Sequence, residues 1–204
     1  MAKLGIEQRV PLNMVEMALL SVLNGNYTPE YFKELAQTEF FGENRAKKMV
    51  GTLNSLVLRN PLLDDMKSQK EQTIAAFQRK NDRPLLFTAM MSAAYPYAYD
   101  TVSVMGKYLH VQDQITTDLL IKKMAEKYGS TRSVDMARFA VLPMIVESGI
   151  IDRVGKGVFS IHKASHFSAF AETLYKKAFL CNNPTLKFED DTSTFPFFEF
   201  VEKE

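Results

Sequence analysis

The 204-residue sequence contains no tryptophan, one cysteine, nine glycines and eight prolines. The single cysteine, Cys181, excludes an internal disulfide framework and any zinc site built from several cysteines. The scarcity of glycine and proline leaves long stretches without turn or break signals, which favours a helical protein. Hydrophobic residues make up 46% of the chain and charged residues 24%, a balance typical of a globular protein with a packed core rather than a disordered chain.

The sequence also lacks a long apolar run. The longest stretch without a charged residue covers residues 84–99, is interrupted by Pro96, and falls short of the roughly 18 residues expected of a membrane span. Residues 1–13 lack the apolar core of a signal peptide. Because a lone cysteine also suits a reducing compartment, we expect a cytoplasmic protein with no membrane partner.

The net charge of +1 indicates neither a nucleic-acid partner nor its absence. The distribution of charge is more informative, because residues 107–183 carry 11 basic and 7 acidic side chains, whereas residues 184–204 carry 2 and 6. A moderately basic block followed by an acidic end is compatible with a surface that attracts a polyanion. Ordinary variation over solvated faces explains the same pattern.

Apolar residues recur with the helical period through the first half of the chain. We expect helices at residues 12–23, 29–41, 43–58, 64–80, 84–95 and 97–109. Thr28 and Pro29 supply an N-cap and a first-turn proline for the second of these helices. Pro96 should kink or break the helical pattern at Tyr95-Pro96. The first three helices predict a small bundle or a helix-turn-helix-like unit.

Residues 114–162 carry the most informative pattern. Their expected elements follow in a fixed order: a helix at 118–128, a polar turn at 130–133, a helix at 134–148 and a hairpin around the Gly-Lys-Gly turn at 155–157. Thr116 or Thr117 can cap the first helix, Gly129 can end it, and Ser133 can cap the second. Helix, turn, helix and hairpin in this order predict a winged helix-turn-helix.

Such a unit can bind DNA by placing the start of its second helix in the major groove, with the hairpin lying over flanking phosphates. Hydroxyl and guanidinium or ammonium groups suit phosphate and guanine acceptors. The candidate nucleic-acid-binding residues are Thr131, Arg132, Ser133 and Arg138 on the helix, and Arg153 and Lys156 on the hairpin.

A purely structural role competes with this interpretation. Winged helices also dock proteins, and Asp135 could hold Arg132 and Arg138 in ion pairs on the helix surface. Pro143 should bend the second helix near its middle. The eleven methionines, Met136 among them, are expected mainly to fill gaps in the core.

Enzyme motifs are absent from the sequence. It contains no G-x-G-x-x-G, no G-x-x-x-x-G-K-[ST], no G-x-S-x-G and no H-E-x-x-H. His162 and His166 are four residues apart, but they fall at a strand end and a helix start, and zinc would need further ligands. We predict no catalytic residue, no cofactor and no metal.

Two aromatic clusters leave alternatives open. Residues 195–200 contain four phenylalanines, and such a segment either docks on the body of the protein or is offered to a partner. We favour docking. Tyr95, Tyr97 and Tyr99 would suit a single-stranded RNA binder if they were exposed beside basic residues, although helical burial explains part of the cluster.

The order of these elements resembles the BrxA family of the BREX bacteriophage-defence systems. The resemblance rests on four segments: Ala94-Tyr95-Pro96-Tyr97-Ala98-Tyr99-Asp100, the helix start at Ile115-Thr116, the polar turn at 130–133, and Met144-Ile145-Val146-Glu147-Ser148-Gly149-Ile150-Ile151. It implies a small, mostly helical, non-enzymatic DNA-binding component that acts beside larger BREX proteins.

We therefore expect a mainly α protein with an N-terminal helical bundle (1–110), a C-terminal winged-helix domain with a small β-hairpin (111–183), and an acidic, Phe-rich C-terminal tail (184–204). Its expected partners are double-stranded DNA and other phage-defence proteins. One alternative is a protein–protein adaptor or assembly factor that uses the winged helix and the tail. The other is an RNA-binding helical protein.

Overall fold

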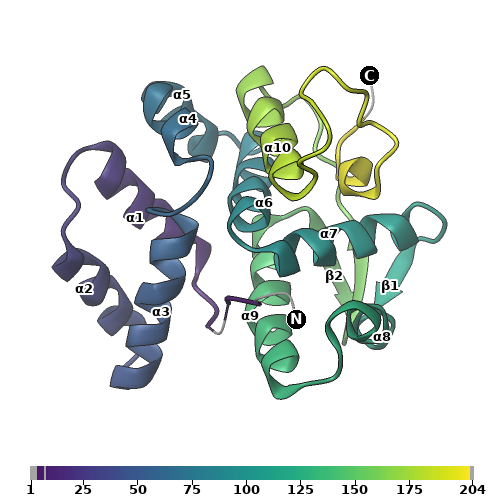
Figure 1. Cartoon of the computed structure of the whole chain (residues 1–204), viewed down its shortest axis with the longest axis horizontal. Helices are drawn as coiled ribbons and strands as arrows, with labels where there is room; N and C mark the ends of the chain where they lie inside the picture. Colours follow the sequence, from purple (N-terminus) through teal and green to yellow (C-terminus); the bar gives the residue numbers. More distant parts are fainter. Residues whose placement is uncertain (1–3, 7, 203–204) are drawn as a thin grey trace.

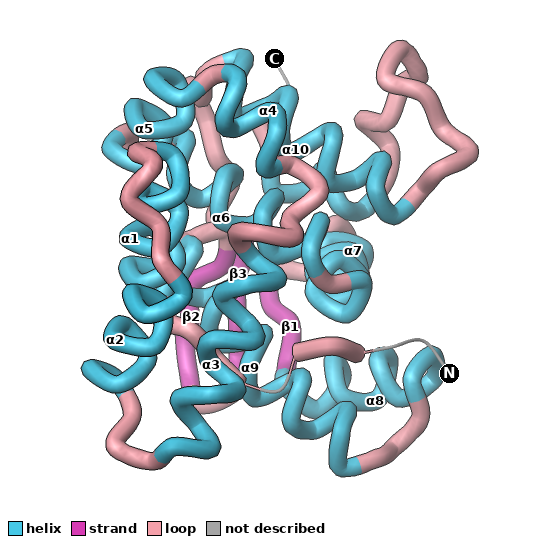
Figure 2. Tube along the Cα trace, turned by 60° about the vertical axis from the view of Figure 1, so that its left-hand side comes forward, coloured by secondary structure: helices cyan, strands magenta, loops and turns pink. Residues whose placement is uncertain are grey.

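The computed structural model describes residues 4–6 and 8–202 as a mainly helical protein with a small antiparallel sheet (Figure 1). Its helices are α1 (Leu12–Leu23), α2 (Pro29–Glu39), α3 (Glu43–Leu56), α4 (Leu63–Ser68), α5 (Lys70–Gln78), α6 (Asp82–Ala94), α7 (Pro96–Leu109), α8 (Thr117–Tyr128), α9 (Arg132–Ser148), α10 (Ala169–Asn182) and the 3-10 helix η1 (Pro196–Phe200). Its strands are β1 (Gln114–Thr116), β2 (Ile151–Gly155) and β3 (Val158–Ile161). In Figure 2 the short strands, in magenta, lie among the helices.

The N-terminal helices begin where their sequence signals predict. The Thr28 hydroxyl accepts a hydrogen bond from the Tyr31 amide at 3.1 Å and so caps α2. The chain leaves helical geometry at Tyr95, which separates α6 from α7 before Pro96. Helix α3 packs against both α1 and α2, as the small bundle, one of the two expected arrangements, requires.

The prediction of one continuous helix at 64–80 is wrong, because Gln69 interrupts it and divides it into α4 and α5. The buried Thr73 hydroxyl donates to the Met66 carbonyl at 2.9 Å. A continuous helix would pair that carbonyl with the amide of Lys70. The side chain therefore replaces a backbone hydrogen bond and stabilises the break.

Helix α6 lies at the centre of the molecule. All residues from 85 to 92 are buried, and the helix packs against α5, α7, α9 and α10. In Figure 1 it lies between α1–α3 and the part that contains the sheet. Buried residues of the three predicted segments belong to one hydrophobic cluster. The boundaries at 110 and 183 stay predictions.

The predicted docking of the Phe-rich tail is confirmed. Phe197 and Phe200 of η1 are fully buried, and the Tyr175 hydroxyl donates to the Phe197 carbonyl at 2.6 Å. The tail packs against α7, with the backbone of Pro196 directly over Gly106.

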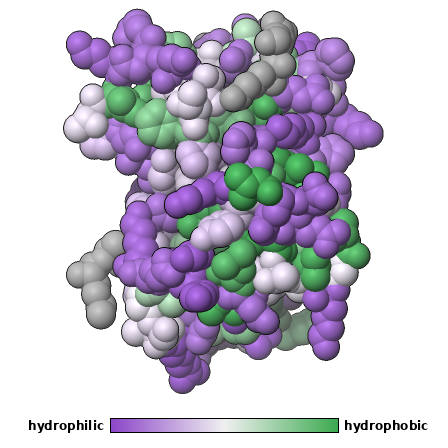
Figure 3. Space-filling view, turned by 90° about the vertical axis from the view of Figure 1, so that its right-hand side faces the viewer, coloured by the Kyte–Doolittle hydropathy of each residue, from purple (hydrophilic) through white to green (hydrophobic). Residues whose placement is uncertain are grey.

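On the side of β1 and the C-terminal segment the surface is mainly hydrophilic, and polar side chains separate its apolar patches (Figure 3).

Glu199 holds the tail to two other segments. Its carboxylate lies 2.9 Å from His110 Nδ1 at the end of α7 and 2.8 Å from Lys163 Nζ after β3. Burial raises the pKa of Glu199, but the hydrogen bonds from Lys163 and His110 outweigh burial, so the pKa lies below its ordinary value of 4.5. The carboxylate is therefore ionised at neutral pH and fixes the orientation of η1.

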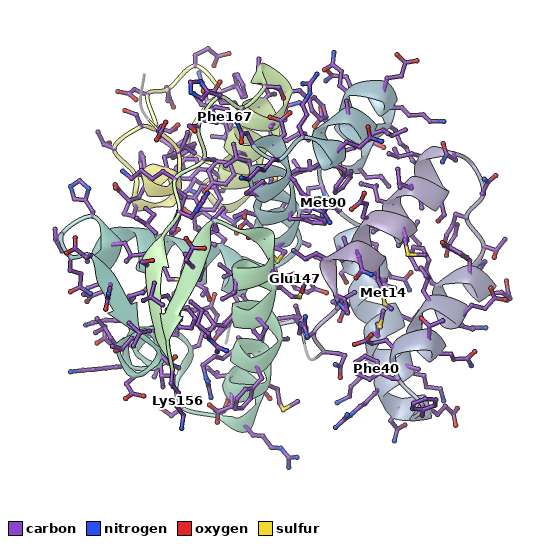
Figure 4. All side chains as sticks on the ribbon, turned by 180° about the vertical axis from the view of Figure 1, so that it is seen from behind. Met14, Phe40, Met90, Glu147, Lys156 and Phe167 are labelled. Carbon is purple, nitrogen blue, oxygen red and sulfur yellow. The ribbon has the colours of Figure 1, made fainter. Side chains whose placement is uncertain are left out.

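Glu147 near the end of α9 joins this helix to α1. Its carboxylate accepts a hydrogen bond from the Leu12 amide at 2.8 Å and pairs with Arg9 Nη2 at 2.9 Å. Figure 4 shows Glu147 on the side of α9 that faces the N-terminal helices. Because Pro11 at the N-cap of α1 has no capping side chain, Glu147 supplies the cap from a distant part of the chain.

Replacing Glu147 by alanine is expected to lower the free energy of unfolding by about 1–2 kcal/mol, since a helix N-cap is lost. The exposed partner Arg9 adds little to this figure. Urea denaturation followed by circular dichroism measures the change. As a matched control, Glu126→Ala removes a local surface pair with Lys123 and should leave the midpoint nearly unchanged. Equal midpoints for the two variants would contradict the capping role.

Candidate nucleic-acid interface

A three-stranded antiparallel sheet of order β1-β3-β2 positions the predicted hairpin. Strands β2 and β3 form the expected hairpin, with Arg153 opposite Phe159, and the turn between them is residues 156–157, since Gly155 still belongs to β2. Strand β1 was not predicted. It is three residues long and pairs with β3 through Ile115 and Phe159. A segment this short has no periodicity of its own, so its pairing depends on β3.

The hairpin turn is tied to the start of α8. Gly157 adopts a φ of 70°, and its carbonyl accepts hydrogen bonds from the Thr117 amide at 2.8 Å and the Thr117 hydroxyl at 3.2 Å. Left-handed geometry of this kind favours glycine. The position of the Gly-Lys-Gly turn relative to the helix pair is therefore fixed by backbone contacts.

Helices α8 and α9 are joined by the predicted polar turn. The Thr116 hydroxyl caps α8 by accepting from the Leu119 amide at 3.2 Å, and Gly129, with a φ of 78°, ends the helix. The expected cap at Ser133 is wrong, because α9 starts two residues earlier. The Thr131 carbonyl accepts from Val134 and Asp135, so Ser133 lies inside the first turn. Pro143 lies within α9, which is one helical segment.

Five of the six predicted site residues are exposed on two neighbouring elements. Thr131, Arg132 and Ser133 form the start of α9, Arg153 lies on β2, and Lys156 lies on the turn. Figure 4 shows Lys156 at the same end of the molecule as the first turn of α9. The structure thus brings the hairpin turn and the start of α9 to one end of the fold.

The three cations among these residues are Arg132, Arg153 and Lys156. None of them has a carboxylate within ion-pair distance among the residues that the structure describes. The guanidinium of Arg153 lies 5.7 Å from the centre of the Phe159 ring. The charges of the three cations are available to a polyanion. The nearby carboxylates have basic partners: Asp135 lies 3.7 Å from Arg138, and Asp152 lies 3.2 Å from His162 Nδ1.

Arg138 differs from the other candidates. Its side chain is only 17% exposed, it pairs with Asp135, and its guanidinium lies 4.1 Å from the centre of the Phe139 ring. The competing interpretation, an ion pair with Asp135 on the helix surface, is therefore confirmed for Arg138 but does not apply to Arg132. Arg138 also lies near Tyr97. Burial raises the pKa of Tyr97 to about 12, although the positive charge of Arg138 acts to lower it.

Sequence reasoning missed the apolar part of this surface. Met136, expected in the core, is exposed on α9, as are Phe139 on the same helix and Val154 on β2. A signal was available in the sequence. At 100° per residue, Met136 and Phe139 fall on the side of Arg132 and opposite the buried Val141.

The other candidate groups do not form sites. His162 pairs with Asp152, whereas His166 lies in the turn before α10 with a φ of 51°, so the two imidazoles share no helical face. Within the described part of the chain, no cluster of three or more His, Cys, Asp or Glu side chains could hold a metal. Tyr95 and Tyr97 are buried, so no exposed platform of three tyrosines is present for RNA bases.

Comparisons with known proteins found no match: no family model, no curated protein and no solved structure matches this chain. Over residues 4–6 and 8–202, no helix has the length and apolar character needed to cross a membrane.

Proposed function

We propose that the segment from α7 to β3 is a winged helix that binds duplex DNA through the first half of α9 and the β2–β3 turn. The order α7-β1-α8-α9-β2-β3 supports this, because a helix pair is followed by a hairpin whose returning strand pairs with the strand before the pair. The observation that carries the proposal is that Arg132, Arg153 and Lys156 are exposed and unpaired with any described carboxylate, with Lys156 at the same end of the molecule as the first turn of α9.

The contacts are expected to be directed mainly at the DNA backbone. Guanidinium and ammonium groups bind phosphate oxygens without reading sequence, and the hydroxyls of Thr131 and Ser133 can add hydrogen bonds. The first turn of α9 is the positive end of its helix dipole, which also favours a phosphate. Arg138 contributes less, because Asp135 and Phe139 already occupy its guanidinium.

The biological setting follows from the resemblance to the BrxA family. We propose a cytoplasmic, non-enzymatic DNA-binding component of a BREX-type phage-defence system, working with other defence proteins. The adaptor alternative loses part of its basis, since Phe197 and Phe200 are buried within the chain and cannot anchor a partner as they stand.

Binding to a 24-base-pair duplex, followed by fluorescence anisotropy at 50, 100 and 200 mM salt, tests this function. Each phosphate neutralised contributes about −0.9 to the slope of log affinity against log salt, so three contacts predict a slope of about −3. Absence of binding at 50 mM salt, or a slope near zero, would rule the proposal out. Tighter binding to single-stranded RNA of the same length would favour the RNA-binding alternative.

A further inference from the structure

We propose that α9 recognises the 5-methyl groups of thymine in the major groove through the exposed side chains of Met136 and Phe139. This inference rests on the proposed function and adds a preference for a base substituent. Met136 is 37% exposed and Phe139 is 59% exposed. With Arg132 they occupy positions i, i+4 and i+7, which places the cation and the two apolar side chains on one side of the helix.

The Phe139 ring is held in place before any ligand binds. The guanidinium of Arg138 lies 4.1 Å from the ring centre, and Asp135 holds that guanidinium at 3.7 Å. A cation stacked on one face restricts the ring while the rest of it stays open to solvent. Arg138 is therefore a positioning residue for Phe139.

The surroundings favour DNA over a protein as the occupant. Arg132 lies one turn before Met136 on the same side of α9, and the hairpin next to α9 carries Arg153 and Lys156. These three cations have no described carboxylate partner. In a polyanion, the thymine methyl is the apolar group that base edges present in the major groove, and phenylalanine is among the side chains that contact it. An apolar protein partner would leave those cations without a counter-charge.

The test compares an alternating dA-dT duplex with an alternating dA-dU duplex, which differ only in the methyl groups. Burying one methyl changes affinity about fourfold, so contact with one or two methyls predicts binding about 4- to 15-fold weaker for the dA-dU duplex. An alternating dG-dC duplex, with and without 5-methylcytosine, separates methyl recognition from A·T-dependent groove shape. The methylated form should bind more tightly.

Two variants assign the preference to residues. Met136→Ala and Phe139→Ala should each bring the ratio of dA-dT to dA-dU affinity toward one. Phe41→Ala serves as the matched control, because Phe41 is fully exposed on the turn between α2 and α3 and lies outside α9 and the hairpin. It should keep the wild-type ratio.

The outcomes separate the two levels of inference. Salt-dependent binding with equal affinity for dA-dT and dA-dU duplexes would overturn the methyl preference and leave DNA binding intact. A ratio that persists in both alanine variants would also overturn it, since other residues would then read the methyl. No binding to any of the duplexes would remove the proposed function and this inference together.

Discussion

Reversing both hairpin cations, in the variant Arg153→Glu/Lys156→Glu, is expected to weaken binding to duplex DNA about a hundredfold at 0.1 M salt. Each phosphate contact contributes about eightfold through counterion release at this salt concentration, and the introduced carboxylates add repulsion. The slope of log affinity against log salt should fall in magnitude by about 2. Anisotropy titrations at three salt concentrations measure both quantities.

The control for this variant must match its change of net charge, from +1 to −3. Lys70→Glu/Lys80→Glu makes the same change at exposed positions, at the start of α5 and in the turn after it. Figure 1 shows α5 at the opposite end of the molecule from the start of α9. If the two double variants lose affinity equally, overall charge rather than the hairpin governs binding. Thermal unfolding of both variants checks that the fold is retained.

Substituting Gly106 by alanine is expected to displace the tail and lower the free energy of unfolding by about 3 kcal/mol or more. A Cβ atom at Gly106 would lie 2.0 Å from the Pro196 carbonyl oxygen and 2.9 Å from its carbon. Backbone atoms cannot yield as a flexible side chain does, so η1 must move. Phe197 and Phe200 then lose burial that stabilises the fold by about 1.5–3 kcal/mol each.

Urea denaturation measures this effect, and Gly51→Ala provides the control. Gly51 lies within α3, and no atom is within 4 Å of a Cβ built there. The same substitution there should raise stability by about 0.5–1 kcal/mol, because alanine favours a helix. A stable Gly106→Ala protein with an unchanged midpoint would show that the tail does not depend on this contact.

Local signals account for the parts of the fold that could be predicted. Thr28 and Thr116 cap α2 and α8 with the hydrogen bonds that their positions predict, and Gly129 and Gly157 adopt the positive φ that their turns require. Each of these features depends on residues within one turn of the chain. The helices and the hairpin were therefore accessible from sequence.

The features that could not be predicted depend on residues far apart in the sequence. Strand β1 forms only because β3 lies beside it, and α1 receives its cap from Glu147, 135 positions later. Met136 is an apolar residue that would suit the core, yet it is 37% exposed. The ion pair of Arg138 with Asp135 could be predicted because the two residues are close in the sequence. The exposure of Arg132 depends on how the whole of α9 packs against the rest of the protein.

Photo-crosslinking from the start of α9 tests whether this end of the fold lies against duplex DNA. A benzophenone side chain placed at the exposed Ser133 should crosslink to a bound duplex, and one placed at the exposed Phe188 in the C-terminal tail should not. Equal crosslinking from the two positions, or crosslinking from Phe188 alone, would show that the start of α9 is not the DNA-binding surface.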